Sequence, residues 1–184
     1  MKKLSVFNFI TLNGYYKSLQ GDIGWHQHGE EENAFSAENM KRENILVFGR
    51  VTYEMMAGFW PTPFAMERDP LTAAGMNNAE KIVFSKTMKK PEWNNTHLIN
   101  EHAVEEMAKL KLSSSKDLTI LGSGSLWPEF AKAGLIDEFS FMIDPVAISH
   151  GVPIFNGIDT MMKLKLTGTR TFKSGTVLMT YSRE

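Results

Sequence analysis

The stretch Ile45-Leu46-Val47-Phe48-Gly49-Arg50-Val51-Thr52-Tyr53-Glu54 decides the fold. Its first half is a short apolar run that ends at a glycine, a pattern typical of a fully buried strand. Its second half predicts a short helix over residues 52–57, with Thr52 close to the N-cap. A buried strand that leads at once into a helix is the repeating unit of a parallel α/β sheet.

The same alternation continues on both sides of this stretch. Buried strands are predicted at residues 4–10, 81–85, 97–99 and 118–122, and helices at residues 30–43, 103–112 and 126–133. Residues 15–29 contain three glycines and few aliphatic side chains, so we expect a long loop there. Ordered loops of this length in compact domains are usually functional or mobile.

The pattern changes after Gly134. Residues 138–143 and 164–172 alternate apolar and polar side chains, and residues 176–181 follow the turn Lys173-Ser174-Gly175. Two alternating strands around a glycine-containing turn predict an antiparallel hairpin. We therefore predict an α/β fold with a mostly parallel central sheet, helices on both faces and a C-terminal antiparallel hairpin, in a single domain over residues 1–184.

The composition limits the function classes. The chain has 184 residues, 42% of them hydrophobic, a net charge of −1 and no cysteine. The balanced charge argues against nucleic acid or a membrane surface as a partner. Without cysteine, disulfides, thiolate nucleophiles and Cys-ligated zinc are excluded. His26 and His28 lack a third ligand, so we predict no metal. With no signal peptide or membrane span expected, the predicted location is the cytoplasm.

Two predicted strand ends carry residues suited to a phosphate. After Gly49, the amides of a helix start attract anions, Arg50 offers a planar guanidinium and Thr52 a hydroxyl group. Ser85 and Lys86 supply a hydroxyl and an ammonium directly after another strand. The alternative for the first is an ordinary capped helix with a solvated arginine, and for the second a polar loop.

A third strand end reads Gly122-Ser123-Gly124-Ser125-Leu126. Glycine lets the backbone approach a pyrophosphate without a Cβ clash. The stretch lacks both the G-x-G-x-x-G fingerprint and a Walker lysine, so a tight turn is the alternative. Because ligands of open α/β sheets lie beyond the carboxyl ends of the strands, the three ends together predict a dinucleotide site.

These motifs, in this order, resemble the dihydrofolate-reductase-like superfamily. The most similar branch is the C-terminal reductase domain of the bifunctional riboflavin-biosynthesis deaminase-reductases and its stand-alone relatives. The resemblance spans about residues 4–182 and implies the dihydrofolate-reductase-like three-layer fold. It rests on residues 11–15, Gly21-Asp22 with Trp25, Val47–Glu54, Ile82–Thr87, Gly122–Leu126, and Leu135-Ile136-Asp137-Glu138 followed by Pro145, Gly151, Pro153 and Phe155.

The resemblance also implies an NADPH site and a small-molecule substrate. The loop from Asn13 to Trp25 would cover the nicotinamide, which makes these two residues candidates for substrate binding. A cationic pair, Arg50 and Lys86, favours the 2′-phosphate of NADPH over NADH. The implied cofactor-binding residues are Gly49, Arg50, Thr52, Ser85, Lys86, Gly122, Ser123, Gly124, Ser125 and Leu126.

The implied activity is hydride transfer to a small heterocycle, most like that of 5-amino-6-(5-phosphoribosylamino)uracil reductase. The candidate proton donors are Asp22, His26, Glu32 and Glu38, of which we select Asp22 and Glu32, and for each the alternative is a solvated surface residue. Relatives commonly form homodimers. The deaminase half requires cysteine zinc ligands, which this sequence lacks. The acidic residue that dihydrofolate reductases use to hold the pterin has no clean match among residues 30–33. A dihydrofolate or pterin reductase and a non-catalytic NADPH-binding module remain alternatives.

Overall fold

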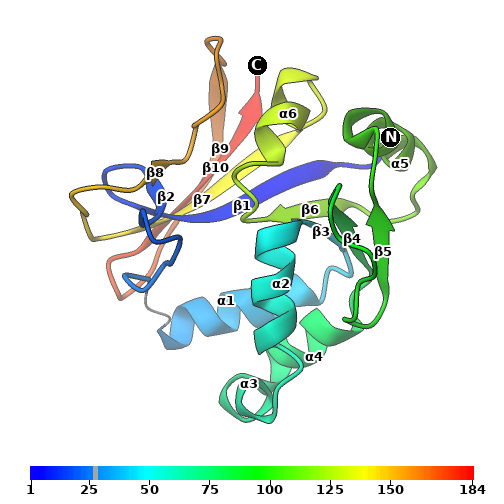
Figure 1. Cartoon of the computed structure of the whole chain (residues 1–184). Coiled ribbons are helices and arrows are strands. Elements are labelled where there is room, and N and C mark those ends of the chain that lie inside the picture. Colours follow the sequence, from blue (N-terminus) through cyan, green and yellow to red (C-terminus); the bar gives the residue numbers. More distant parts are fainter. Residues whose placement is uncertain (27–28) are drawn as a thin grey trace.

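The computed structural model describes residues 1–26 and 29–184 and is built on one large sheet (Figure 1). This sheet has eight strands in the order β5-β4-β3-β6-β1-β7-β10-β9. In chain order they are β1 (Leu4–Thr11), β3 (Ile45–Gly49), β4 (Lys81–Phe84), β5 (Thr96–Ile99), β6 (Leu118–Leu121), β7 (Glu138–Asp144), β9 (Leu164–Thr171) and β10 (Val177–Arg183).

The strand directions confirm the predicted class of sheet. All neighbours from β5 to β7 pair in parallel, whereas β10 pairs antiparallel with both β7 and β9. The turn between β9 and β10 contains Gly175, whose φ of 89° favours glycine. A second, two-stranded sheet pairs β2 (Tyr15–Lys17) with β8 (Val152–Pro153). The prediction of an uninterrupted loop over residues 15–29 was therefore wrong at its start, and residues 27 and 28 lie outside the described residues.

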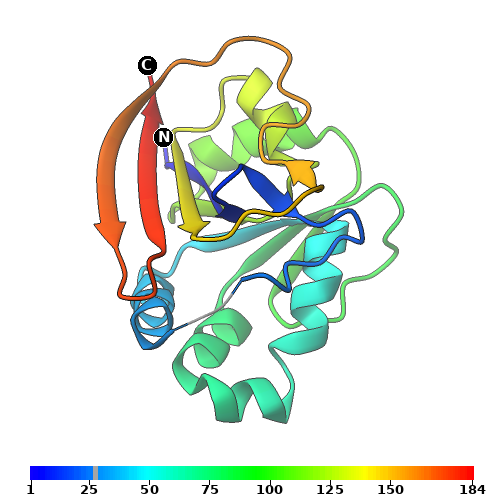
Figure 2. The same cartoon turned by 90° about the vertical axis from the view of Figure 1, so that its left-hand side faces the viewer.

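Helices cover both faces of the large sheet, as predicted (Figures 1 and 2). One face carries α1 (Glu30–Met40), α2 (Arg50–Phe59), α3 (Pro63–Arg68) and α4 (Pro70–Asn78), and the other carries α5 (Ala103–Ser113) and α6 (Trp127–Lys132). The sequence pattern did not predict α3 and α4. Both begin with a proline directly after a side chain that caps the helix, Thr62 for α3 and Asp69 for α4.

The two faces of the sheet are packed differently. Beneath α5 and α6 lies one continuous core that includes Val6, Ile120, Trp127 and Phe139. On the opposite face the buried side chains form two separate clusters. One, around Leu46, Phe48, Tyr53, Met76, Val83 and Trp93, comes from β3, β4 and the segments packed on them, and the other, around Met142, Phe172 and Leu178, includes Phe35 of α1.

The central strands β1 and β6 are only partly covered on the face that carries the two separate clusters. Residues of β1 alternate between fully buried on the α5–α6 side and half-buried on the other, and β6 repeats this pattern. A central strand is normally covered on both faces, because parallel sheets bury both. The half-buried face of β1 and β6 is therefore the floor of an open space between α1 and α2.

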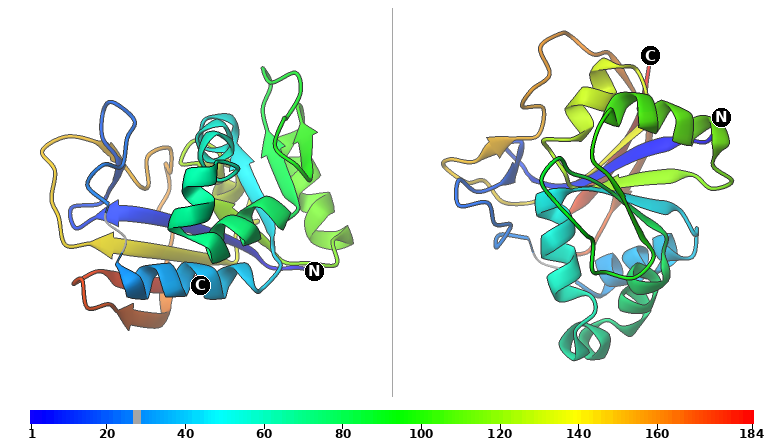
Figure 3. Two further views of the ribbon diagram at one scale, coloured as in Figure 1. Left: turned by 90° about the horizontal axis from the view of Figure 1, so that it is seen from below. Right: turned by 45° about the vertical axis from the view of Figure 1, so that its right-hand side comes forward.

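The helices α1 and α4 meet beside this space (Figure 3). The contact is between Met40 and Gly75, where a Cβ built on Gly75 would lie 2.5 Å from the Met40 Cβ. Only glycine allows the helices to approach this closely. In the described part of the chain, no helix is long and apolar enough to cross a membrane.

Candidate functional site

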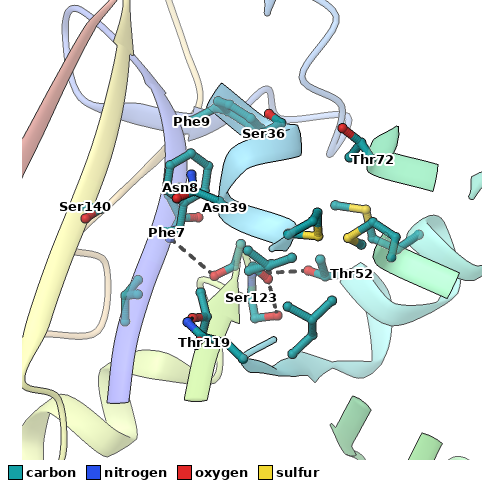
Figure 4. Close-up of a pocket in the computed structure, with 18 of the residues that line it drawn as sticks. Phe7, Asn8, Phe9, Ser36, Asn39, Thr52, Thr72, Thr119, Ser123 and Ser140 are labelled. Carbon is teal, nitrogen blue, oxygen red and sulfur yellow. Dashed lines mark hydrogen bonds between the residues drawn. The ribbon is translucent and has the colours of Figure 1, made fainter. Parts of the chain in front are cut away.

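A cleft of about 1430 Å³ lies over the half-buried faces of β1 and β6 (Figure 4). Phe7 and Phe9 of β1 and Thr119 and Leu121 of β6 contribute to its floor. The helices α1, α2 and α4 supply the walls, and the junctions after β3 and β6 close its end at the carboxyl ends of the strands. This is the edge of the sheet where open α/β folds bind their ligands.

Hydrogen bonds hold the β3–α2 and β6–α6 junctions together. The Gly49 N–H donates to the Ser123 Oγ at 2.9 Å, and the Ser123 N–H donates to the Thr52 Oγ1 at 3.2 Å. Figure 4 shows Ser123 facing Thr52 across this contact. The N-cap of α2 is Gly49, so the expectation that Thr52 lies close to the cap was wrong. Its hydroxyl group joins the two junctions instead.

The backbone of the β6–α6 junction leaves amides free. Gly122 and Ser123 both adopt left-handed conformations, with φ of 58° and 56°. The N–H groups of the next two residues, Gly124 and Ser125, donate to no group in the described part of the chain. Gly124 also packs against Tyr16, since a Cβ there would lie 2.4 Å from the Tyr16 Cζ. Neighbouring free amides beside a cleft suit an anion such as a diphosphate.

The structure brings six of the predicted cofactor residues to the lining of the cleft: Gly49, Thr52, Gly122, Ser123, Gly124 and Ser125. Leu126 lies behind them, 3.6 Å from a Cβ built on Gly49. Their role toward a cofactor stays a prediction.

The other three predicted cofactor residues lie near this end of the cleft but do not line it. Arg50 is 45% exposed and its guanidinium contacts the Glu54 carboxylate at 2.9 Å. Ser85 follows directly after Phe84, the partner of Gly49 in the parallel register, and its hydroxyl accepts from the Thr87 and Met88 N–H groups. Lys86 is exposed. Both cations are therefore at the surface beside the joined strand ends.

The predicted substrate-binding residues lie outside the cleft lining. Asn13 accepts a hydrogen bond from Thr11, and its side-chain amide donates to the Ile148 carbonyl at 2.8 Å. Asn13 thus connects the first turn to the loop after β7. Trp25 has a buried indole Nε1 with no hydrogen-bond partner among the described residues. It contacts His26 edge-on, at 6.2 Å between ring centroids.

The predicted proton donors also lie apart from the cleft lining. Asp22 is in an exposed turn, where hydrogen bonds from the Ser18 hydroxyl and the Gly24 N–H lower the pKa of its carboxyl group. Glu32 is buried in α1 and accepts hydrogen bonds from the Gly29 N–H and the Ser174 hydroxyl. In these positions Asp22 stabilises a turn, and Glu32 stabilises the start of α1.

The sequence did not single out several side chains that line the cleft. Asn33, Ser36 and Asn39 follow one another at intervals of three along α1. Figure 4 shows Thr72 of α4 across the cleft from Ser36 and Asn39. The spacing of three along a helix could have indicated a shared face, but it could not show that this polar face is turned toward the sheet.

A buried His26–Asp144 pair lies behind Phe9. The His26 Nδ1 is 2.8 Å from the Asp144 Oδ2, and the imidazole ring stacks on Phe9 at 3.8 Å between centroids. This pair ties the loop after β2 to the end of β7. Among residues 1–26 and 29–184 no group of three His, Asp or Glu side chains could hold a metal ion, and His28 lies outside these residues.

Among the solved structures that share this fold, three show the range of similarity. A Shewanella sp. PV-4 protein, whose name assigns it to riboflavin biosynthesis, superposes with a TM-score of 0.78 at 21% identity, over 99% of both chains. A second structure superposes with a TM-score of 0.69 at 14% identity, over all of this chain and 57% of the other. It is the Thermotoga maritima diaminohydroxyphosphoribosylaminopyrimidine deaminase/5-amino-6-(5-phosphoribosylamino)uracil reductase. Enterococcus faecalis dihydrofolate reductase, complexed with NADP(H), superposes with a TM-score of 0.64 at 20% identity, over 99% of this chain and 96% of the other.

Sequence comparison identifies the family to which the chain belongs. The uncharacterized protein YyaP of Bacillus subtilis is 30% identical over 176 residues, which cover 94% of this chain and 90% of YyaP. The model of the RibD C-terminal domain matches residues 2–178. This match covers nearly the whole chain and confirms the resemblance to the riboflavin-type reductases. The protein belongs to the RibD C-terminal domain family, a reductase-like family with the dihydrofolate-reductase-like fold.

Proposed function

We propose that this protein is an NADPH-dependent reductase that transfers a hydride to a small heterocyclic substrate in the cleft. The observation that carries the proposal is the joining of the β3–α2 and β6–α6 junctions through Ser123, with the free amides of Gly124 and Ser125 beside it. A reductase of this kind needs its coenzyme fixed against the substrate more than it needs a strong acid.

The chain offers suitable groups for each part of the coenzyme. The junction residues Gly49, Thr52 and Gly122–Ser125 would hold the diphosphate through backbone amides and hydroxyl groups. Arg50 and Lys86, at the surface beside these junctions, would recognise the 2′-phosphate. The bound coenzyme supplies the hydride. The half-buried aromatic floor around Phe7 and Phe9 would keep water away from the reacting atoms.

The substrate named for the Thermotoga protein, 5-amino-6-(5-phosphoribosylamino)uracil, is the first compound to test. Fold similarity supports this choice only as far as the reductase class. A dihydropterin is the alternative suggested by dihydrofolate reductase. Against it stands the cleft side of α1, which presents Asn33, Ser36 and Asn39 where a pterin would require a carboxylate.

Two measurements test the proposal. Quenching of tryptophan fluorescence should report saturable binding of NADPH, with weaker binding of NADH. The absorbance of the reduced coenzyme should then fall steadily when the correct substrate is added. A protein that binds NADPH but oxidises it with no member of a broad carbonyl and imine panel would be a binding module instead. A protein that binds neither coenzyme at millimolar concentration would contradict the proposal.

A further inference from the structure

Asn8 is a buried polar side chain in the middle of β1. It is only 3% exposed and stands in the row of Leu4, Val6 and Ile10, the β1 residues that pack into the core beneath α5 and α6. A carboxamide group at such a position is costly unless hydrogen bonds replace the water that it loses. Buried polar groups almost always have a partner, so the partner of Asn8 indicates what the residue does.

The partner of the Asn8 amide is the residue that follows β6. Phe7 pairs with Leu121 in the parallel register, so Asn8 stands beside Gly122. The Asn8 Nδ2 donates to the Gly122 carbonyl at 3.3 Å, and the Gly122 N–H donates to the Phe7 carbonyl at 2.9 Å. The Asn8 side chain makes no other hydrogen bond in the described part of the chain. Two successive residues of β1 therefore hold both polar groups of Gly122.

The bond from Asn8 holds one end of a peptide group whose other end is held from α2. The carbonyl of the Gly122–Ser123 peptide accepts from Asn8, and the N–H of the same peptide donates to the Thr52 Oγ1 at 3.2 Å. In Figure 4, Asn8 and Thr52 lie on either side of Ser123. The plane of this peptide is therefore fixed both from β1 and from α2.

The fixed peptide links two residues in the left-handed region, Gly122 with a φ of 58° and Ser123 with a φ of 56°. A left-handed residue that carries a side chain is uncommon and persists only where its surroundings hold it. A rotation of the peptide plane would change the ψ angle of Gly122 and the φ angle of Ser123 together. The direction of the backbone that follows thus depends on the bonds from Asn8 and Thr52.

The backbone that follows carries the free amides of the β6–α6 junction. The N–H groups of Gly124 and Ser125 donate to no described group, and both residues line the carboxyl end of the cleft. Free amides bind an anion best when they already point toward it, because the anion then does not have to reorder the backbone. Asn8 therefore acts on the direction of these amides from the neighbouring strand, through Gly122.

We propose that Asn8 is a positioning residue for the coenzyme diphosphate, which acts by holding the Gly122 carbonyl and not by contact with the coenzyme. This inference rests on the proposed function and adds a residue from β1, a strand that carries none of the cofactor-binding residues predicted from the sequence. A purely structural role leads to a different expectation. Leucine has nearly the same shape as asparagine and suits an apolar row, so leucine at position 8 would then leave ligand binding unchanged.

Two variants that remove the Asn8 donor test the proposal. NADPH is titrated by tryptophan fluorescence, and inorganic pyrophosphate, which stands in for the diphosphate alone, is titrated by phosphorus NMR. Asn8→Leu and Asn8→Ala should each weaken the binding of both ligands about three- to tenfold, because both lack the bond to Gly122. Only Asn8→Ala leaves a cavity in the core, so only this variant should unfold at a clearly lower urea concentration.

Asn44→Leu is the matched control. The Asn44 Nδ2 donates to the Thr119 Oγ1 at 2.9 Å, at the amino end of β6, so this variant also removes an amide bond to β6 but leaves the turn after it unaltered. It should bind both ligands like the unaltered protein. Unchanged affinities in both Asn8 variants would overturn the proposal, as would a loss in Asn8→Ala that Asn8→Leu does not share.

The two ligands separate this proposal from the proposed function. If the unaltered protein binds pyrophosphate but not NADPH, the proposed function is wrong, and the pyrophosphate titrations alone decide whether Asn8 positions the anion-binding turn. If it binds neither ligand, both proposals are wrong.

Discussion

The Gly49 amide donates to the Ser123 hydroxyl at 2.9 Å, which ties together the carboxyl ends of two neighbouring strands, β3 and β6. The same hydroxyl group donates to the Leu121 carbonyl at 3.0 Å. One side chain therefore positions both backbone segments that would hold the coenzyme diphosphate. The predictions below begin with this contact.

Ser123→Ala should weaken NADPH binding about tenfold and lower the free energy of unfolding by about 1–2 kcal/mol, because it leaves the Gly49 N–H without its acceptor. Fluorescence titration and urea denaturation measure the two effects. Ser113→Ala, at the exposed end of α5, is the control and should change neither. Unchanged coenzyme affinity in Ser123→Ala would show that the joined junctions do not hold the diphosphate.

Gly124→Ala should weaken NADPH binding, because the new methyl group would lie 2.4 Å from the Tyr16 Cζ and force the ring or the loop to move. Overpacking of this kind typically costs about 1–3 kcal/mol. Adding Tyr16→Ala should relieve the clash and restore most of the affinity. If the double variant binds as weakly as Gly124→Ala alone, the loss comes from the Gly124 backbone and not from Tyr16.

Arg50→Ala should weaken NADPH about five- to tenfold and leave NADH almost unchanged, since only NADPH carries the 2′-phosphate. Glu54→Ala provides the opposite change. It frees the Arg50 guanidinium from its 2.9 Å ion pair and should raise NADPH affinity slightly. Titration of both coenzymes with both variants measures the selectivity. Equal losses for NADPH and NADH in Arg50→Ala would argue against recognition of the 2′-phosphate.

Lys81 should make stability depend on pH. Its fully buried ammonium donates to the Asn77, Ala79 and Asn94 carbonyls, and burial lowers its pKa to about 8, from 10.5. Between these two values the unfolded chain binds the proton that the folded chain has released. The free energy of unfolding should therefore rise with pH across this window, by up to about 3 kcal/mol.

The variant Lys81→Met isolates this effect. Lysine-dependent stability is obtained as the difference between denaturation curves of the unaltered protein and the variant across the same pH range. The variant should lack the rise above pH 8. Parallel curves for the two proteins would show that the Lys81 pKa is the same in the folded and unfolded chains.

The sequence predicted the sheet, and the residues at the carboxyl ends of its strands, because these depend on local patterns. Apolar runs that end at Gly49 and Gly122 mark the strands, and the helix-forming segments after them require parallel neighbours. Both glycines do lie at one end of the cleft. The family resemblance rested on the same local motifs and was confirmed by the match over residues 2–178.

The walls of the cleft depend on contacts between distant segments, which local patterns do not encode. Glu32 looks like a solvated residue in an acidic run, but Ser174, 142 residues away, helps to bury it. Thr72 belongs to a helix that the pattern did not predict. Lys81 begins a strand that the pattern predicts as buried, but the pattern does not show which groups receive its ammonium. These are the carbonyls of residues 77, 79 and 94, which lie outside the strand.

At the contact between Met40 and Gly75, the lack of a side chain on residue 75 determines how closely α1 and α4 approach at the cleft. Both residues line it, and the two helices can be this close only because residue 75 has no side chain. A single methyl group there would collide with Met40 and push α1 and α4 apart. Position 75 is therefore a point at which mutation, in the laboratory or in evolution, could admit bulkier molecules to the cleft without changing the β3–α2 and β6–α6 junctions.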